Sequence, residues 1–245
     1  MRQSCPTPTR ISPHALLWLV LAGAGFQSAQ AAEPLRYGAY WAGAKVGEAE
    51  VHIERSEESY RIEGKAWTLG LVNRVTRWRG NFDAEGSIQD GKVTPKSYGF
   101  HTRQRGDRTR STKMADGKVE SFRDGRQRDS GPAPDGLDML TALFLPGECD
   151  EFDSLHTGTS FYELALIEQS KTPANGRNPA RERCKFEVID EDGDSYQVEV
   201  EVAQFGEHRI PIRIDIGGFL TGSVRILDMP SDSAFPSART NGDQL

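Results

Sequence analysis

Metal-binding and cofactor-binding patterns are missing from the sequence. Only three of its 245 residues are cysteines, and they are spread along the chain. After residue 31, no two histidines or cysteines stand at the short spacing that zinc sites use. We therefore predict that the protein has no metal site and no cofactor.

Catalytic motifs are missing as well. The sequence contains neither the Gly-x-Ser-x-Gly motif of a hydrolase nucleophile nor a glycine-rich phosphate loop. Asp190, Asp192 and Asp194 are spaced like the start of a calcium loop, but Ser195 stands where such a loop needs glycine. We predict no catalytic residues and expect a protein that is not an enzyme. A hydrolase with an unrecognised pair of carboxylates stays open as an alternative.

Long apolar runs are also missing, apart from one near the N-terminus. That run, Ala15–Phe26, is about a dozen residues long, whereas a membrane span needs about 20. Two arginines and no acid precede it, and the small residues Ala29 and Ala31 after it fit a signal-peptidase site. We expect residues 1–31 to be a cleaved secretory signal and the mature chain not to span a membrane. An uncleaved N-terminal anchor is the alternative.

Basic residues are in the minority. The chain has 30 lysines and arginines against 36 acids, a net charge of −6. Loss of the two arginines in the signal changes this to about −8. An excess of acid argues against nucleic acid as the main partner.

Two cysteines remain after the signal, Cys149 and Cys184. An even number of cysteines in an exported protein predicts a disulfide. Such a bond closes a loop of about 36 residues, which the chain-entropy account rates at about 4 kcal/mol. Two free thiols are the alternative.

The hydrophobic pattern of the mature chain alternates with the period of β-strands. Ala49, Val51 and Ile53 alternate with charged residues, as on a half-buried strand. Asp-Gly pairs at positions 90, 116 and 124 mark tight hairpins, because both residues tolerate the positive φ such turns require. Closely spaced hairpins predict an antiparallel meander of roughly eleven or twelve strands. We expect one β-rich domain over 32–229 and a disordered tail over 230–245.

One helix is predicted, over Asp135–Leu145. Leu137, Leu140 and Phe144 suit its buried face, and Asp135 or Asp138 is expected to cap its start. The segment 69–73 breaks the strand pattern and is either a short helix or a wide turn.

Several segments together resemble a known family. These segments are Leu35–Glu48, Tyr60–Leu71, Phe82–Gly86 and Leu137–Leu145. The chain is similar to an uncharacterised bacterial exported family, the domain of unknown function family 3108. The resemblance implies a periplasmic or envelope location and a mainly β fold, with a single curved antiparallel sheet or barrel-like meander. It implies no catalytic residues.

A basic stretch stands out in this acidic chain. Arg77 and Arg79 share one strand face, and so do Arg103 and Arg105. If the two strands are neighbours, these arginines form a cationic patch, and guanidinium groups bind phosphates and carboxylates in forked pairs. A solvated outer face balanced by nearby acids is the alternative.

Aromatic residues gather in the N-terminal half. Five of them are predicted to line an apolar cavity under the curved sheet, namely Tyr37, Trp41, Trp67, Trp78 and Phe82. Ordinary core packing is the alternative.

These features favour a non-catalytic envelope protein that binds an apolar, anionic, lipid-like ligand or a partner protein through its curved sheet. The alternative is a structural or interaction module for envelope integrity. That alternative predicts a filled interior without a ligand cavity.

Overall fold

The computed structural model describes one continuous β-sheet and two short helices. The described residues are 33–106, 108–145, 149, 153–176, 178–206, 208–217 and 221–230. The predicted signal and residues 231–245 of the predicted tail lie outside them. No helix in the described ranges is long and apolar enough to cross a bilayer.

Fifteen strands form the sheet, in the order β8-β7-β6-β5-β4-β3-β2-β1-β15-β14-β13-β12-β11-β10-β9. The first eight are β1 Leu35–Trp41, β2 Ala44–Arg55, β3 Ser59–Thr68, β4 Arg79–Gln89, β5 Lys92–Gln104, β6 Arg108–Ala115, β7 Lys118–Arg123 and β8 Arg126–Pro132. The others are β9 Leu137–Asp138, β10 Ser154–His156, β11 Phe161–Thr172, β12 Arg181–Asp190, β13 Ser195–Phe205, β14 His208–Ile216 and β15 Gly222–Ile226. All neighbours pair antiparallel except β9 and β10. The predicted fold class is confirmed, with more strands than expected.

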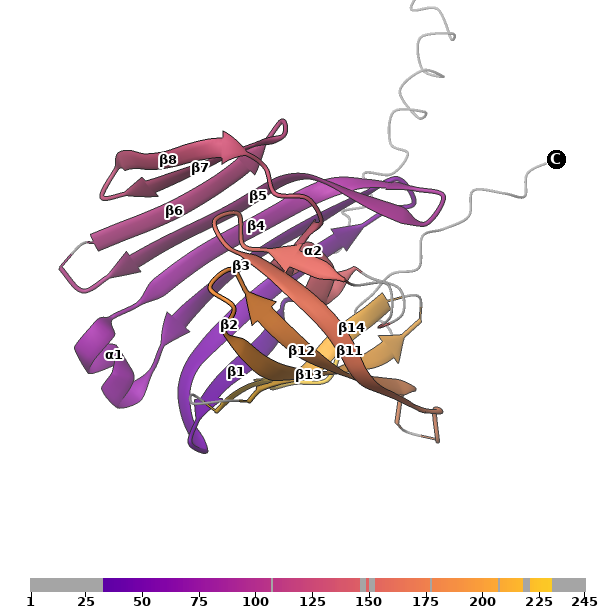
Figure 1. Ribbon diagram of the computed structural model, residues 1–245. Coiled ribbons are helices and arrows are strands. Elements are labelled where there is room, and N and C mark those ends of the chain that lie inside the picture. The colour runs from indigo at the N-terminus through magenta and orange to yellow at the C-terminus, as the bar shows by residue number, and fades with distance from the viewer. Residues whose placement is uncertain are drawn as a thin grey trace, which may run out of the picture. The chain divides into compact units, whose positions relative to one another are not determined.

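The sheet curls round on itself (Figure 1). Its two edge strands are β8 and β9, yet only residues 133–136 separate them in the sequence. A step of that length spans at most about 18 Å, so the two edges come close at this point. Strand β9 also packs against β5. The result is a half-open, barrel-like sheet whose edge strand β9 lies inside the curve.

Local sequence explains the strands and their turns. In β3, Tyr60 and Ile62 are buried and alternate with exposed charged residues, so one face points inward. At the predicted hairpins, Asp90, Asp116 and Asp124 all have positive φ, and so does each following glycine. This is the conformation of the turns that the Asp-Gly pairs predict.

Two helices accompany the sheet. Helix α1, Gly70–Thr76, connects β3 to β4, in the segment where the sequence left a helix or a wide turn open. Helix α2, Met139–Phe144, lies inside the curve and is shorter than predicted, because residues 137–138 pair as β9. Its N-cap is Asp138.

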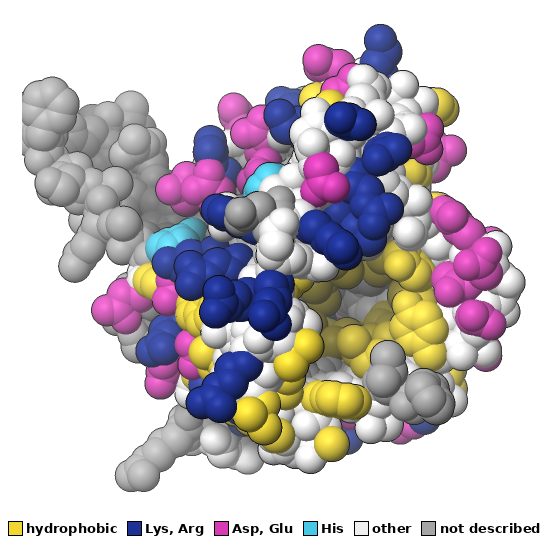
Figure 2. Space-filling view, turned by 90° about the vertical axis from the view of Figure 1, so that its left-hand side faces the viewer, with side chains coloured by type: hydrophobic (Ala, Val, Ile, Leu, Met, Phe, Trp, Pro, Cys, Tyr) yellow, Lys and Arg dark blue, Asp and Glu magenta, His cyan; other side chains and the backbone are white. Residues whose placement is uncertain are grey.

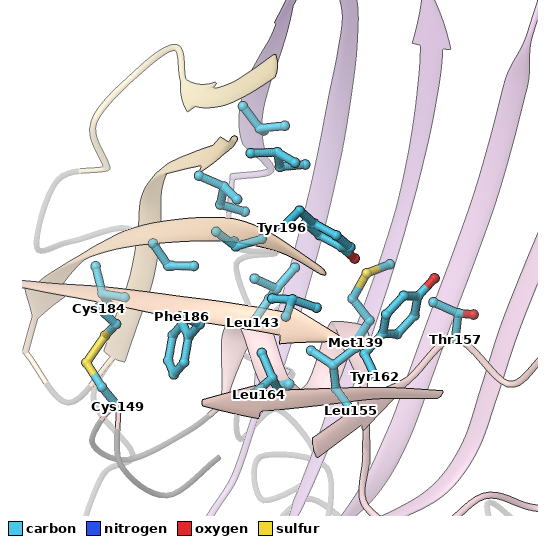
Figure 3. A pocket seen from close by; sticks show the side chains of 18 of the residues that line it. Met139, Leu143, Cys149, Leu155, Thr157, Tyr162, Leu164, Cys184, Phe186 and Tyr196 are labelled. Atoms are coloured by element: carbon cyan, nitrogen blue, oxygen red, sulfur yellow. A yellow bond between two sulfur atoms is a disulfide. The ribbon is translucent and has the colours of Figure 1, made fainter. Parts of the chain in front are cut away.

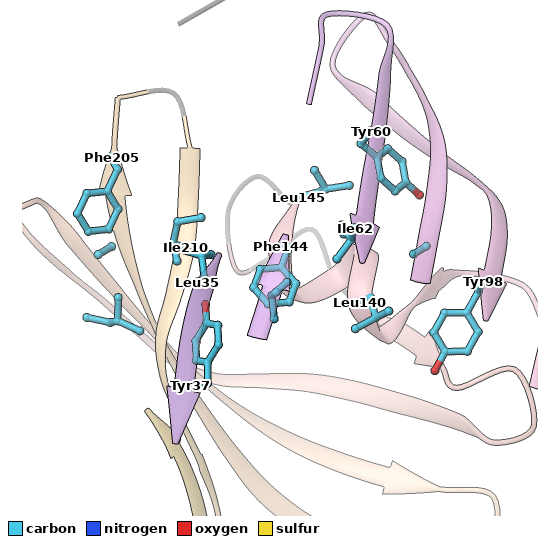
Figure 4. Packing of buried hydrophobic residues seen from close by; sticks show 14 of the residues in the cluster. Leu35, Tyr37, Tyr60, Ile62, Tyr98, Leu140, Phe144, Leu145, Phe205 and Ile210 are labelled. Carbon is cyan, nitrogen blue, oxygen red and sulfur yellow. The ribbon is translucent and has the colours of Figure 1, made fainter. Parts of the chain in front are cut away.

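The main core surrounds α2. Its Leu140 and Phe144 are buried among residues of β1 and β3, including Tyr37 and Ile62 (Figure 4). The Phe144 ring meets the Tyr37 ring edge-on at 6.1 Å between centroids. The same core takes Phe205 from β13 and Ile210 from β14, so the helix fills one side of the curve between these strands and β1–β6.

Candidate functional site: an apolar pocket beside a basic rim

The other half of the curve contains a pocket. Its volume is about 380 Å³, within the usual range for small-molecule sites. The walls come from β10–β15, from Thr157 and from one side of α2 (Figure 3). Apart from Thr157, two tyrosines and Arg209, the lining side chains are apolar.

Strand periodicity builds these walls. On β13, every second residue from Tyr196 to Val202 lines the pocket, and on β12 Phe186 and Val188 do the same. Helix α2 gives Met139, Ala142 and Leu143 to the pocket. The opposite side of this helix faces the main core. Helix α2 is thus a partition between a filled half and a hollow half.

The charge inside the pocket is neutralised. Arg209 on β14 contacts the carboxylate of Glu182 on β12. The same carboxylate accepts a hydrogen bond of 2.6 Å from Gln169 and lies 3.6 Å from the Lys171 ammonium group. Within the described chain the pocket wall therefore offers a ligand mainly apolar contacts.

The predicted disulfide forms one end of the pocket. Cys149 and Cys184 are bonded, with their Cα atoms 5.8 Å apart, and both line the pocket (Figure 3). The Glu182 carboxylate lies within 4.8 Å of both sulfur atoms. Disulfide sulfurs lack the thiolate charge that binds zinc, so the oxidised protein does not present this cluster as a metal site.

A buried polar cluster fixes α2 in place. Asp138 accepts hydrogen bonds from the Thr141 amide (2.9 Å) and the Thr141 hydroxyl (2.6 Å). The Thr141 hydroxyl has one proton, so it accepts from the Tyr60 hydroxyl at 2.9 Å. Burial raises the pKa of Asp138, and its hydrogen bonds with Thr141 oppose this. The chain Tyr60–Thr141–Asp138 ties the partition helix to β3.

His156, on β10, is a second buried polar residue beside Asp138. It pairs in register with Asp138, and its Nδ1 accepts a hydrogen bond from the Gly158 amide at 3.2 Å. The imidazole is therefore neutral, with its proton on Nε2. Burial lowers the pKa of His156, although the neighbouring Asp138 carboxylate raises it.

His156 should make the protein less stable in acid. Below its usual pKa of 6.5 the unfolded chain binds a proton that the folded chain does not, so stability falls with pH. Asp138 has a raised pKa and acts in the opposite direction. We expect His156→Asn, which keeps an acceptor for Gly158, to reduce the stability lost between about pH 6.5 and 5. Urea midpoints across pH test this, and an unchanged slope would rule His156 out.

A hydrolase would need two carboxyl groups that face each other across a cleft. Among the described residues, the two carboxyl groups with a raised pKa do not form such a pair. The pKa is raised for two carboxyl groups, those of Asp83 and Asp138, chiefly by burial. Asp83 shares the outer face of β4 with exposed residues, because its neighbour Ala84 points inward. Asp138 lies inside the curve. The two carboxyl groups lie on opposite faces of the sheet and do not face each other across a cleft.

The predicted arginine patch lies at one end of the sheet. Arg79 and Arg103 are directly opposite each other on β4 and β5, on the outer face. Arg77 caps the C-terminus of α1, and the Arg105 amide bonds to the Thr76 carbonyl oxygen at 2.8 Å. The structure thus brings Arg79 and Arg103 together and places the other two beside α1.

A second basic group lies on the concave face, which the sequence pattern alone does not indicate. Thr112 points inward on β6, so Arg108 and Arg110 share its face. Arg110 is opposite Arg123 on β7, and Arg123 is opposite Arg126 on β8. We call Arg108, Arg110, Arg123 and Arg126 the inner basic row. No acid in the described part of the chain forms a salt bridge with them.

This row lies next to the pocket. Gly158 follows the pocket residue Thr157, and its Cα is so close to Thr112 that an added Cβ would lie 2.5 Å from the Thr112 methyl. Arg110 is the next inward residue on the same strand. Figure 2 shows a hollow with hydrophobic walls and basic side chains gathered beside it on the same face.

The five aromatic residues predicted to line a cavity lie elsewhere than in this pocket. Tyr37 is buried in the main core, Phe82 packs against that core over Gly64, and the Trp78 ring lies over Gly80. Trp41 is mostly exposed, and Trp67 lies under the Lys65 ammonium group. Helix α2 fills the space under these strands, and the hollow is left under β11–β15 instead.

The fold and pocket define a half-open, barrel-like β protein with an apolar interior site. Residues 36–226 match the family DUF3108, described as a protein of unknown function, and the chain belongs to this family. A similar structure is the crystal structure of a beta-barrel-like protein of domain of unknown function DUF1849 from Brucella abortus. It is 11% identical with a TM-score of 0.46, and the match covers 81% of this chain and 98% of that one. No curated protein matches this chain.

Proposed function

We propose that this protein is a non-catalytic envelope protein, exported to the periplasm, that binds an apolar, anionic, lipid-like ligand. The observation that carries the proposal is the apolar pocket of about 380 Å³, open on a face where basic side chains gather. A pocket of this size accommodates an acyl chain, and burial of apolar area is favourable by about 25 cal/mol per Å².

The ligand's anionic end is expected outside the pocket. Arg209 inside is already paired with Glu182, so a buried headgroup would have to compete with that carboxylate. The inner basic row, in contrast, has no acid partner among the residues described. A lipid-like ligand would place its acyl chain against the apolar walls of the pocket and its anionic headgroup near Arg110.

The existence of the hollow also bears on the alternative of a purely structural module. That alternative expects a filled interior, as found on the other side of α2. The hollow is open at the surface, so its apolar walls contact water unless something covers them, and such exposure of apolar area is unfavourable. An apolar hollow held open by a partition helix is better explained by a ligand.

A pocket-filling variant tests the proposal. Ala142 faces the pocket from α2, and Ala142→Phe should fill it and weaken binding of a fluorescent fatty-acid probe at least about tenfold. Ala115→Phe, on the exposed end of β6, is the matched control and should bind like the parent protein. Equal affinity in all three proteins, or no binding by the parent, would overturn the proposal. Native mass spectrometry of periplasmic protein would identify a retained ligand by its mass.

A further inference from the structure

Helix α1 exposes its apolar side chains. Leu71 and Val75 are 76% and 68% exposed, and no residue of this helix is buried. They are four residues apart and therefore share one helix face. The helix does not use this face to pack against the sheet, so folding alone does not explain the two residues.

A third exposed apolar residue lies at the same end of the sheet. Trp41 ends β1 and is 53% exposed. It belongs to the β1–β2 hairpin, and α1 packs against β2, where the Leu69 amide donates to the Val46 carbonyl oxygen at 2.7 Å. Figure 1 shows α1 and this hairpin at the same end of the sheet.

The surroundings of α1 are basic. The segment 69–82 contains Arg74, Arg77 and Arg79 and no acid. Arg105 and Arg108 approach from the next hairpin and, with Val72, Val75 and Trp78, line a shallow depression. None of these five arginines forms a salt bridge with an acid of the described chain. The end of the sheet is thus apolar at its tips and positively charged around them.

We propose that this end of the sheet, the α1 end, docks on an anionic lipid bilayer. Exposed leucine, valine and tryptophan side chains suit the headgroup–acyl boundary, and arginines around them attract anionic headgroups. Charge complementarity selects the bilayer, since the arginines carry a positive charge that no described acid offsets. The proposal does not depend on ligand binding.

Vesicle co-sedimentation tests the α1 end. The mature protein should sediment with vesicles of phosphatidylcholine mixed with phosphatidylglycerol, and much less with phosphatidylcholine alone. Arg74→Gln with Arg77→Asn should weaken binding roughly 10- to 30-fold, since each basic residue contributes about 1 kcal/mol near an anionic surface. Asparagine is chosen because Arg77 has positive φ, which asparagine tolerates.

A second pair of variants separates apolar insertion from charge. Leu71→Ser with Val75→Ser should weaken binding about tenfold without unfolding, because neither side chain is buried. Leu166→Ser with Ile167→Ser, also exposed but on β11, is the matched control and should bind like the parent. Equal binding to both vesicle types, or control and α1 variants that behave alike, would overturn the proposal. Fatty-acid probe affinity should stay unchanged in the α1 variants, so failure of docking is distinguishable from failure of ligand binding.

Discussion

Replacement of Asp138 by alanine is expected to destabilise the protein by about 3 kcal/mol or more. The substitution removes the N-cap of α2 and both hydrogen bonds to Thr141, and it leaves the Thr141 amide and hydroxyl buried without their acceptor. The Thr141 hydroxyl also holds the Tyr60 hydroxyl, so the tie between the partition helix and β3 weakens with it. Urea unfolding followed by tryptophan fluorescence measures the loss.

Two other variants show which property of Asp138 matters. Asp138→Asn keeps an acceptor for the Thr141 amide and removes a charge that burial disfavours, so it should cost much less than alanine. Asp135→Ala removes the exposed aspartate that the sequence offered as the other cap, and should change the unfolding midpoint little. If the Asp138 and Asp135 alanine variants are equally stable, the polar cluster does not hold α2 in place.

Features that depend on neighbouring residues could be predicted from the sequence. The Asp-Gly pairs fix positive φ at two successive positions, and this requirement is local. Alternation in β2 likewise tells which side chains share a face, because successive residues point to opposite sides. Helix α2 was identified by the same reasoning. Of the two caps that the sequence leaves open, Asp138 is the N-cap, and the expected range 135–145 is too long at its start because residues 137–138 pair with 155–156, a pairing that the sequence does not indicate.

The location of the pocket could not be predicted, for a different reason. Alternating valines on β13 indicate an inward face, but they do not tell whether that face meets a helix or empty space. Helix α2 decides this, because its Leu140 and Phe144 fill one side of the curve together with residues of β1–β6, β13 and β14, whereas the space beside its Met139 and Ala142 stays open. Inward aromatic residues such as Tyr37 and Phe82 therefore contribute to the core and not to this pocket.

The inner basic row illustrates a similar limit. The sequence shows many arginines between positions 103 and 126, but their faces depend on where each strand begins its alternation. Thr112 and Met114 are buried, which turns Arg110 inward, whereas buried Thr102 turns Arg103 outward. One stretch of basic sequence thus supplies both an outer patch and a row beside the pocket.

Loss of the disulfide should have the second large effect. Cys149 and Cys184 are 35 positions apart, and closing a loop of that length stabilises the folded chain by about 4 kcal/mol on the chain-entropy account. Cys149→Ser with Cys184→Ser should therefore lower the urea midpoint strongly, and reduction of the parent protein should give the same result. The double variant itself should not respond to reductant.

The same bond should also matter for the ligand, because it forms one end of the pocket and Cys184 lies two residues before Phe186 on β12. Without it, we expect the fatty-acid probe to bind several-fold more weakly under conditions where the chain is still folded. For the reduced parent protein a chelator belongs in the buffer, since the two sulfur atoms and Glu182 lie within 4.8 Å of one another in the bonded form and thiolates bind zinc. A stability loss with unchanged probe affinity would show that the bond supports the fold but not the site. No loss of either would mean that the two cysteines contribute nothing through their bond.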